Sequence, residues 1–271
     1  MKKSDLEEAL EKELSSRWNL VTEEAMRYSV LSGGKRIRPA LLLTVGEDLG
    51  FEEKQLMDLA VAVELFHTAS LIHDDLPSID NSDYRRGKPT CHKVFGEGIA
   101  VLAGDGLFFR AYEIVSKLGN VVLIREFSEM AFDLLIGEAM DVEFEKRGYA
   151  TKEQIEKMYE FKTGALFGFC FSAPLVLAGI DHEEMKRLGR IFGVAFQIYD
   201  DLKDLNGDVE KLGKDTGKDV NKITLIKKIG IEGSKRRADE YYESVLVGLE
   251  RMKFLKTRDF LVEIKRVIEE R

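Results

Sequence analysis

The stretch EEKQLMDLAVAVELFHTASLIHDDLPSID (residues 52–80) decides the fold, because it joins a long apolar run to three aspartates. Apolar residues recur at three- and four-residue spacing over a length too great for a strand, which predicts a helix. Pro77 disfavours helical geometry just before it. We therefore expect the helix to end near Asp74 and Asp75, with Asp80 in the turn beyond.

The same helical period dominates the rest of the chain, and no alternating strand pattern of comparable strength occurs. Nothing in the sequence marks a linker, a repeat or a low-complexity region. We therefore predict an all-α fold in which residues 1–271 form a single domain, a bundle of roughly ten helices around a central core. The clearest further helical segments are residues 5–18, 124–146 and 186–205.

Charge and cysteine content narrow the function classes. The chain has 271 residues, with 41 Lys plus Arg against 49 Asp plus Glu and a net charge of −8, which argues against a general nucleic-acid binder. Cys91 and Cys170 are too few and too far apart for a disulfide framework and lack metal-ligand spacing. A reducing cytoplasm fits this cysteine content best.

Targeting signals and membrane spans are not expected. The first residues, MKKSDLEEALEKEL, are charged where a signal peptide would be apolar. The longest uncharged stretch, residues 163–180, is near the lower length limit for a span, and Ser172 and Pro174 interrupt it. We interpret this stretch as a buried core helix and predict no integral membrane segment.

A second acidic cluster, FQIYDDLKD (residues 196–204), also follows an apolar helical run. Asp200 and Asp204 share a helix face, with Asp201 beside them, and like charges at this spacing destabilise a bare helix. A single cluster of this kind also fits a solvated acidic turn, but two clusters can hold cations between helices of a bundle. Ligation by oxygen alone favours Mg²⁺ with phosphate oxygens completing its coordination.

Basic clusters next to glycines indicate where a phosphate group would bind. LSGGKRIRP (31–39) supplies Lys35, Arg36 and Arg38, and YRRGKPT (84–90) supplies Arg85, Arg86 and Lys88. Each cluster alone also fits surface ion pairs. Next to the acids and glycines they indicate an anion site, because guanidinium groups match phosphate oxygens and glycines allow close backbone approach. Lys162 in FKTGALF and Lys214 in LGKDTGKD extend this set.

The motifs GGKRIRP, DDLPSID with RRGKPT, KTGALF, and FQIYDDLKD with LGKD occur in an order and spacing that resemble the short-chain trans-isoprenyl diphosphate synthases. The resemblance covers residues 30–225. It implies an isoprenoid synthase fold with a deep central cavity, a homodimer, and a reaction in which an allylic diphosphate ionises and isopentenyl diphosphate attacks the cation. One departure is Glu138 in IGEAMD (136–141), where the family commonly has glutamine.

The same resemblance implies roles for individual residues. Three Mg²⁺ ions, or Mn²⁺ in their place, would be held by the aspartates of both motifs: Asp74, Asp80, Asp200 and Asp204, supported by Asp75 and Asp201. Isopentenyl diphosphate would be bound by Lys35, Arg38, His67 and Arg86. The allylic diphosphate would be bound by Arg85, Lys162 and Lys214, with Thr163 and Gln197 beside the developing cation.

The requirements of allylic diphosphate ionisation are consistent with these residue roles. Breaking a C–O bond to a diphosphate requires neutralisation of the leaving group by metals and cationic side chains. The resulting carbocation needs a dry apolar cavity, and no covalent nucleophile is required. A class I terpene cyclase would lack the GGKRIRP site, and a noncatalytic synthase subunit would be expected to lose aspartates.

Product length is the finest prediction from the sequence. In the family, bulky aromatic residues at the fifth and fourth positions before the first aspartate close the pocket at the farnesyl length. Ala69 and Ser70 occupy those positions here. We therefore predict geranylgeranyl diphosphate as the product, with farnesyl diphosphate as the alternative and Phe108 and Phe109 as a possible lower floor.

Overall fold

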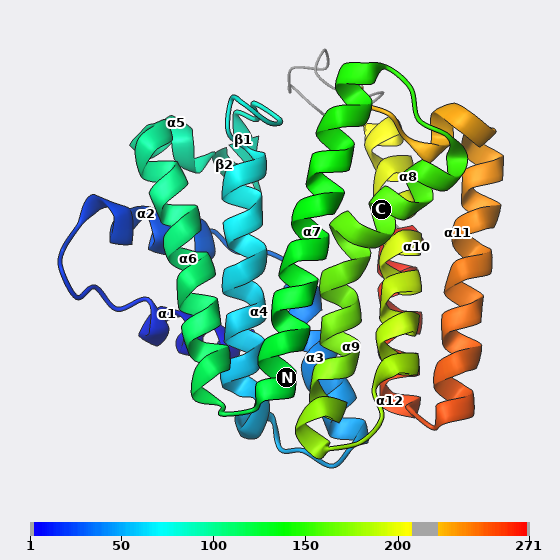
Figure 1. Ribbon diagram of the computed structural model, residues 1–271, viewed down its shortest axis with the longest axis horizontal. Coiled ribbons are helices and arrows are strands. Elements are labelled where there is room, and N and C mark those ends of the chain that lie inside the picture. The colour runs from blue at the N-terminus through cyan, green and yellow to red at the C-terminus, as the bar shows by residue number, and fades with distance from the viewer. Residues whose placement is uncertain (1–2, 208–221, 270–271) are drawn as a thin grey trace. The chain divides into compact units, whose positions relative to one another are not determined.

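The computed structural model describes residues 3–207 and 222–269, and these residues are almost entirely helical (Figure 1). The predicted all-α fold is confirmed. The chain divides into two compact units, Met1–Arg125 and Glu126–Arg271.

The first unit is organised around α4 (Glu53–Asp74), which packs against α1, α2, α3 and α6. Contacts on several sides explain why this helix has a buried, apolar surface around most of its circumference. A two-stranded antiparallel hairpin follows α4 and pairs Tyr84 with Pro89. The remaining elements are α1 (Lys3–Glu13), α2 (Val21–Val30), α3 (Ile37–Asp48), β1 (Tyr84–Arg85), β2 (Lys88–Pro89), α5 (Cys91–Phe95) and α6 (Glu97–Lys117).

The second unit is organised around α10 (Glu183–Gly207), which packs against α9 and α11. A π-helical turn, η1 (Glu160–Gly164), joins α8 to α9 and also lies against α10. The other elements are α7 (Val121–Arg147), whose first residues belong to the first unit, α8 (Lys152–Tyr159), α9 (Ala165–Ala178), α11 (Leu225–Met252) and α12 (Leu255–Glu269).

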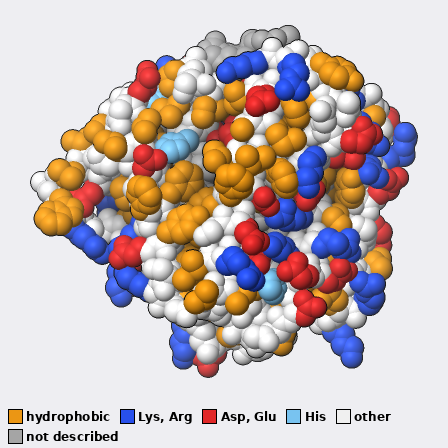
Figure 2. Space-filling view, viewed as in Figure 1, with side chains coloured by type: hydrophobic (Ala, Val, Ile, Leu, Met, Phe, Trp, Pro, Cys, Tyr) orange, Lys and Arg blue, Asp and Glu red, His pale blue; other side chains and the backbone are white. Residues whose placement is uncertain are grey.

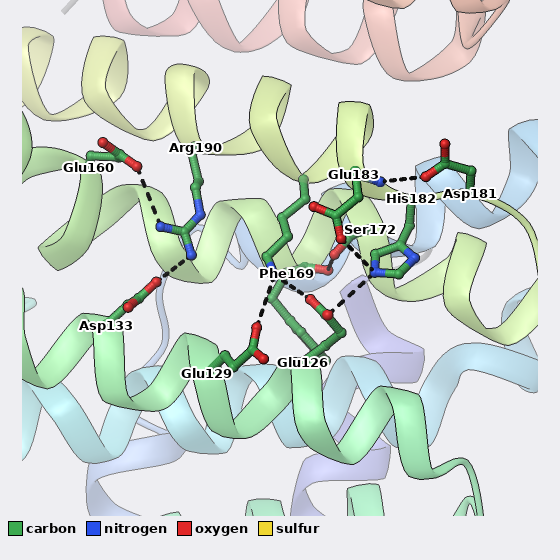
Figure 3. Close-up of polar contacts among 11 residues, drawn as sticks. Glu126, Glu129, Asp133, Glu160, Phe169, Ser172, Asp181, His182, Glu183 and Arg190 are labelled. Carbon is green, nitrogen blue, oxygen red and sulfur yellow. Dashed lines mark hydrogen bonds and ion pairs between the residues drawn. The ribbon is translucent and has the colours of Figure 1, made fainter.

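Ion pairs connect α7 to α10 in the second unit. Lys186 Nζ lies 2.5 Å from Glu126 Oε2. Arg190 bonds to Asp133 on α7 and to Glu160 on η1 (Figure 3). Glu126 is only 4% exposed, so its carboxylate requires the partner that Lys186 provides.

Two helical segments are long and apolar enough to cross a membrane by length and composition, residues 53–74 and 152–178. Their most apolar windows are 72% and 78% buried within the protein, which is typical of core helices. Cys91 and Cys170 are both buried, and they are not joined by a disulfide.

Candidate active site

The first acidic motif lies where α4 ends. The helix stops at Asp74, as the following proline predicts, and the main chain folds back so that the Asp80 N–H donates to the Asp74 carbonyl at 2.8 Å. Asp74 and Asp80 are therefore neighbours at one turn, although six positions separate them. This geometry confirms the predicted helix end and the turn beyond it.

Asp75 has a different environment from its neighbours. It is 3% exposed and forms a bidentate contact with Arg85. Arg85 donates from Nε to Oδ2 at 2.7 Å and from Nη2 to Oδ1 at 2.7 Å. The hairpin presents Arg85 to this carboxylate through a turn with positive φ at Arg86 and Gly87. Both oxygens of Asp75 are bonded to Arg85, so a metal ion would have to compete with Arg85 for them. The direct role of Asp75 is to orient Arg85.

Three of the residues predicted to bind isopentenyl diphosphate come together in the first unit. Arg38 Nη1 donates to His67 Nε2 at 3.2 Å, and Arg86 donates to the Gly33 carbonyl. Burial, followed by the positive charges of Arg38 and Arg86, lowers the pKa of His67 well below 6.5. His67 is therefore a neutral acceptor beside two cations, in a setting suited to an anion.

The glycines and the remaining cations of GGKRIRP have distinct roles. A Cβ at Gly34 would lie 2.9 Å from Arg86 Cζ, so this glycine permits the close approach of the guanidinium. Lys35 is exposed. Arg36 is 3% exposed and pairs with Glu64 at 2.5 Å and with Glu7 at 2.9 Å, so its role is structural.

The residues predicted to limit product length lie in α4. Ala69 is fully buried and Ser70 is 8% exposed, with its hydroxyl donating to the His67 carbonyl. Phe108 packs against Phe66, with ring centroids 4.7 Å apart. Phe109 is 74% exposed in the chain, so its predicted place in a cavity floor is wrong for the isolated chain.

The second acidic motif lies on α10. Asp200 and Asp204 are exposed, whereas Asp201 is part-buried between two protein donors. Burial, together with the charges of Asp200 and Asp204, raises the pKa of Asp201 to about 6 despite those hydrogen bonds. Three carboxylates that repel one another in this way fit a bound cation.

Thr163 and Gln197 are in direct contact, as a shared site requires. The Thr163 hydroxyl donates to Gln197 Oε1 at 2.6 Å, and Gln197 Nε2 donates to Asp201 Oδ1 at 2.9 Å. Thr163 belongs to η1, and π-helical turns occur frequently at functional sites. The predicted cation-facing pair is thus joined to the second acidic motif.

Lys162 is held by α7. Its Nζ lies 2.5 Å from Asp141 Oδ2 and 2.9 Å from Glu138 Oε2. Glu138 therefore adds a negative charge at Lys162 where glutamine would be neutral. Gly137 makes this approach possible, because a Cβ there would lie 2.1 Å from the Lys162 backbone nitrogen. Lys214, the remaining predicted diphosphate ligand, lies outside the described residues.

Glycines spaced by four on facing elements bring η1 and α9 close to α10. A Cβ at Gly193 would lie 2.4 Å from Gly164 Cα, and one at Gly189 would lie 2.8 Å from Gly168 Cα. This close crossing was not among the features predicted from the sequence. The spacing of four in KTGALFG and in GRIFG was the signal that could have revealed it.

A separate group with metal-ligand spacing lies at the other end of α10. Single ligand atoms of Glu126, His182 and Glu183 lie within 4.8 Å of one another (Figure 3). Asp200 follows Glu183 by seventeen positions of α10, which is roughly 25 Å along the helix. Lys186 already occupies one oxygen of Glu126. This group is therefore distinct from the predicted magnesium site.

Comparison with known proteins identifies the family. The polyprenyl synthetase family model matches residues 19–247. A farnesyl diphosphate synthase of Bacillus subtilis is 41% identical over 233 residues, covering 80% of this chain and 78% of that protein. Geranylgeranyl pyrophosphate synthase 3 (chloroplastic) of Arabidopsis thaliana is 40% identical over 249 residues, covering 86% of this chain and 69% of that protein.

Structural comparison agrees with the family match. A crystal structure of a geranyltranstransferase from Thermotoga maritima superimposes with a TM-score of 0.93 at 58% identity, covering 100% of this chain and 98% of that one. The sequence motifs, the helical fold and these relatives agree, and the chain belongs to the polyprenyl synthetase family as a short-chain trans-prenyltransferase that elongates prenyl diphosphates.

Proposed function

We propose that the chain condenses isopentenyl diphosphate head to tail with allylic diphosphates in a Mg²⁺-dependent reaction, with geranylgeranyl diphosphate as the main product. The observation that carries this proposal is the common design of the two acidic motifs. In each, the second aspartate is tied to protein donors, Asp75 to Arg85 and Asp201 to Tyr159 and Gln197. The family match covers both motifs, which supports assigning residues 1–271 to one functional domain.

We assign the metal ions to the aspartates that flank those tied residues: Asp74, Asp80, Asp200 and Asp204. Carboxylate oxygens are suitable ligands for Mg²⁺ or Mn²⁺, and three ions per site remain the expectation. Bound ions would neutralise the charge that develops on the departing diphosphate. Asp75 and Asp201 then support the site by orienting neighbours, Arg85 in the first motif and Gln197 in the second.

The chain's cations divide between two diphosphates in this proposal. Lys35, Arg38, His67 and Arg86 bind isopentenyl diphosphate, and the contact of Arg38 with neutral His67 supports their grouping. Arg85, Lys162 and Lys214 bind the allylic diphosphate. Thr163 and Gln197 lie beside the developing allylic cation in this assignment, and apolar helix faces exclude water from it.

Arg38→Ala is expected to raise the KM for isopentenyl diphosphate by about tenfold or more, with a smaller change in the KM for the allylic primer. Loss of a charged hydrogen bond to a phosphate removes about 1.5–3 kcal/mol of binding. Steady-state kinetics with each substrate varied in turn measures the two KM values. Lys162→Ala is the matched variant and should show the reverse split; equal effects on both substrates would argue for one shared anion pocket.

Small residues at positions 69 and 70 support the geranylgeranyl product. Ser70 lies one helical turn before Asp74, where a growing prenyl chain would descend from the metals. A farnesyl product is the second candidate, because the Thermotoga maritima relative at 58% identity is named a geranyltranstransferase.

Ser70→Phe or Ala69→Phe is expected to shorten the main product from twenty to fifteen carbons while condensation continues, because added bulk blocks the chain and leaves the aspartates untouched. Chromatography of dephosphorylated products from labelled isopentenyl diphosphate measures the shift. Ser70 is the better position, since Ala69 has no exposed surface and phenylalanine there strains the core. Release of farnesyl diphosphate alone by the wild type, with isopentenyl diphosphate in excess, would reject the deep pocket.

We also propose that the enzyme is a cytoplasmic homodimer. Hydrophobic side chains gather over α6 on the face drawn in Figure 2, and Val101, Leu102 and Phe109 on that helix are 39%, 56% and 74% exposed. An exposed apolar stripe of this kind is suited to burial against a second copy of the chain. The two cysteines are not joined by a disulfide, which fits a reducing compartment.

One experiment tests the proposed function against its rivals. Purified protein is incubated with Mg²⁺, labelled isopentenyl diphosphate and dimethylallyl, geranyl or farnesyl diphosphate in separate reactions. We expect incorporation of label with every accepted primer. A terpene cyclase would release diphosphate from the allylic substrate without incorporating the label, and a noncatalytic subunit would do neither.

A further inference from the structure

The second acidic motif is bonded to a tyrosine that is not among the predicted site residues. Tyr159, the last residue of α8, is 3% exposed, and its hydroxyl donates to Asp201 Oδ2. The same hydroxyl oxygen accepts from the backbone N–H of Leu225, the first residue of α11, at 3.0 Å. One side chain thus joins α8, α10 and α11.

The hydrogen bonds around Asp201 all point toward its carboxylate. Tyr159 donates to Oδ2, and Gln197 Nε2 donates to Oδ1 at 2.9 Å. Gln197 in turn accepts from the Thr163 hydroxyl at 2.6 Å, which fixes the orientation of its amide. Both carboxylate oxygens are held, and such directed chains strengthen one another in a site of low dielectric.

This arrangement restrains the turn of α10 that carries Asp200 and Gln197. A part-buried carboxylate with one oxygen left without a hydrogen bond would reorient, and this change would alter Gln197, whose amide donates to Oδ1. Asp200 is exposed and adjacent to Asp201. Because Tyr159 also bonds to the start of α11, the restraint on Asp201 fixes the α10 backbone next to Asp200.

We propose that Tyr159 is a positioning residue for the second acidic motif, which holds Asp201 and thereby orders Asp200 for divalent cations and Gln197 for the allylic substrate. This inference rests on the proposed function, because it takes Asp200 as a metal ligand. Tyr159 acts through Asp201 and Gln197 and does not contact the substrate itself.

Tyr159→Phe tests the inference. We expect the Mg²⁺ concentration for half-maximal turnover to rise about tenfold, which corresponds to loss of one hydrogen bond to a charged group. Calorimetric titration of Mn²⁺ with inorganic diphosphate present should show weakened binding of similar size, independent of turnover. The KM for isopentenyl diphosphate should remain unchanged, because its proposed ligands belong to the first unit.

Tyr242→Phe is the matched control. Tyr242 is also fully buried in the second unit, but its hydroxyl donates to the Leu261 main-chain carbonyl. Both variants should lower the melting temperature, and only Tyr159→Phe should change the Mg²⁺ requirement. A merely structural role of Tyr159 predicts the same behaviour for both variants and would overturn the inference.

A double-mutant cycle with Asp201→Asn shows whether Tyr159 acts through Asp201. We expect the double variant to be little worse than either single variant in Mn²⁺ binding, because both changes break one interaction. Strictly additive losses would overturn the inference. If Tyr159→Phe does not fold, Asp201→Asn alone must still weaken Mn²⁺ binding about tenfold, and wild-type binding in it would also overturn the inference.

The proposed function and this inference fail in different ways. A wild-type protein with no Mg²⁺-dependent condensation and no Mn²⁺–diphosphate binding would reject both. An active wild type, combined with a Tyr159→Phe variant of unchanged metal dependence, would reject the inference and leave the proposed function standing.

Discussion

Asp200→Ala is expected to reduce kcat by about 10³-fold or more, a loss of roughly 4 kcal/mol of transition-state stabilisation. Asp200 is an exposed carboxylate on α10, so the substitution removes a proposed cation ligand and no core contact. Turnover at saturating substrate and graded Mg²⁺ measures the effect. Asp74→Ala should give a comparable loss, because it removes the corresponding ligand of the first motif.

The thermal stability of Asp200→Ala should rise slightly or stay unchanged, although its turnover falls. The charge of Asp200 contributes to the raised pKa of Asp201, after burial, so its removal relieves repulsion. We expect thermal unfolding of Asp200→Ala at or slightly above the wild-type temperature. Glu183→Ala is the matched control, because Glu183 is an exposed carboxylate at the start of the same helix and should leave turnover unchanged. Wild-type turnover in folded Asp200→Ala would contradict the metal assignment.

Local signals predicted the first acidic motif well. The end of α4 at Asp74 follows from a steric effect of Pro77 on its neighbours, which depends on adjacent residues alone. The bidentate ion pair between Arg85 and Asp75 could not be predicted from neighbouring residues. It depends on a hairpin turn with positive φ at Arg86, a conformation that arginine rarely adopts and that tertiary contacts must select.

The residues of the second acidic motif were predicted, but the hydrogen bonds that connect them to Tyr159 were not. The resemblance to a family supplied Thr163, Gln197 and the aspartates of α10. Tyr159 was missed because 42 positions separate it from Asp201, and a tyrosine in a helical pattern is ordinarily read as core. The π-helical turn at residues 160–164 also escaped prediction, because one extra residue in a turn leaves no clear mark on apolar periodicity.

Gly193→Ala is expected to lower the free energy of unfolding by about 3 kcal/mol and the melting temperature by roughly 10 °C. The added Cβ would lie 2.4 Å from Gly164 Cα and 3.1 Å from the Thr163 carbonyl carbon. Both contacts are with backbone, so no flexible side chain can move away. The π-helical turn and α10 must separate, which also weakens the Thr163–Gln197 hydrogen bond and should lower kcat.

Thermal and chemical denaturation, followed by kinetics on the folded fraction, measure both effects. Gly98→Ala is the matched control, because Gly98 lies in α6 with no atom within 4 Å of the added Cβ. There the helix propensity of alanine should dominate and stabilise the protein by up to about 1 kcal/mol. Equal stability changes in the two variants would contradict the role of Gly193, because helix propensity favours alanine at both positions and only the close crossing with Gly164 distinguishes them.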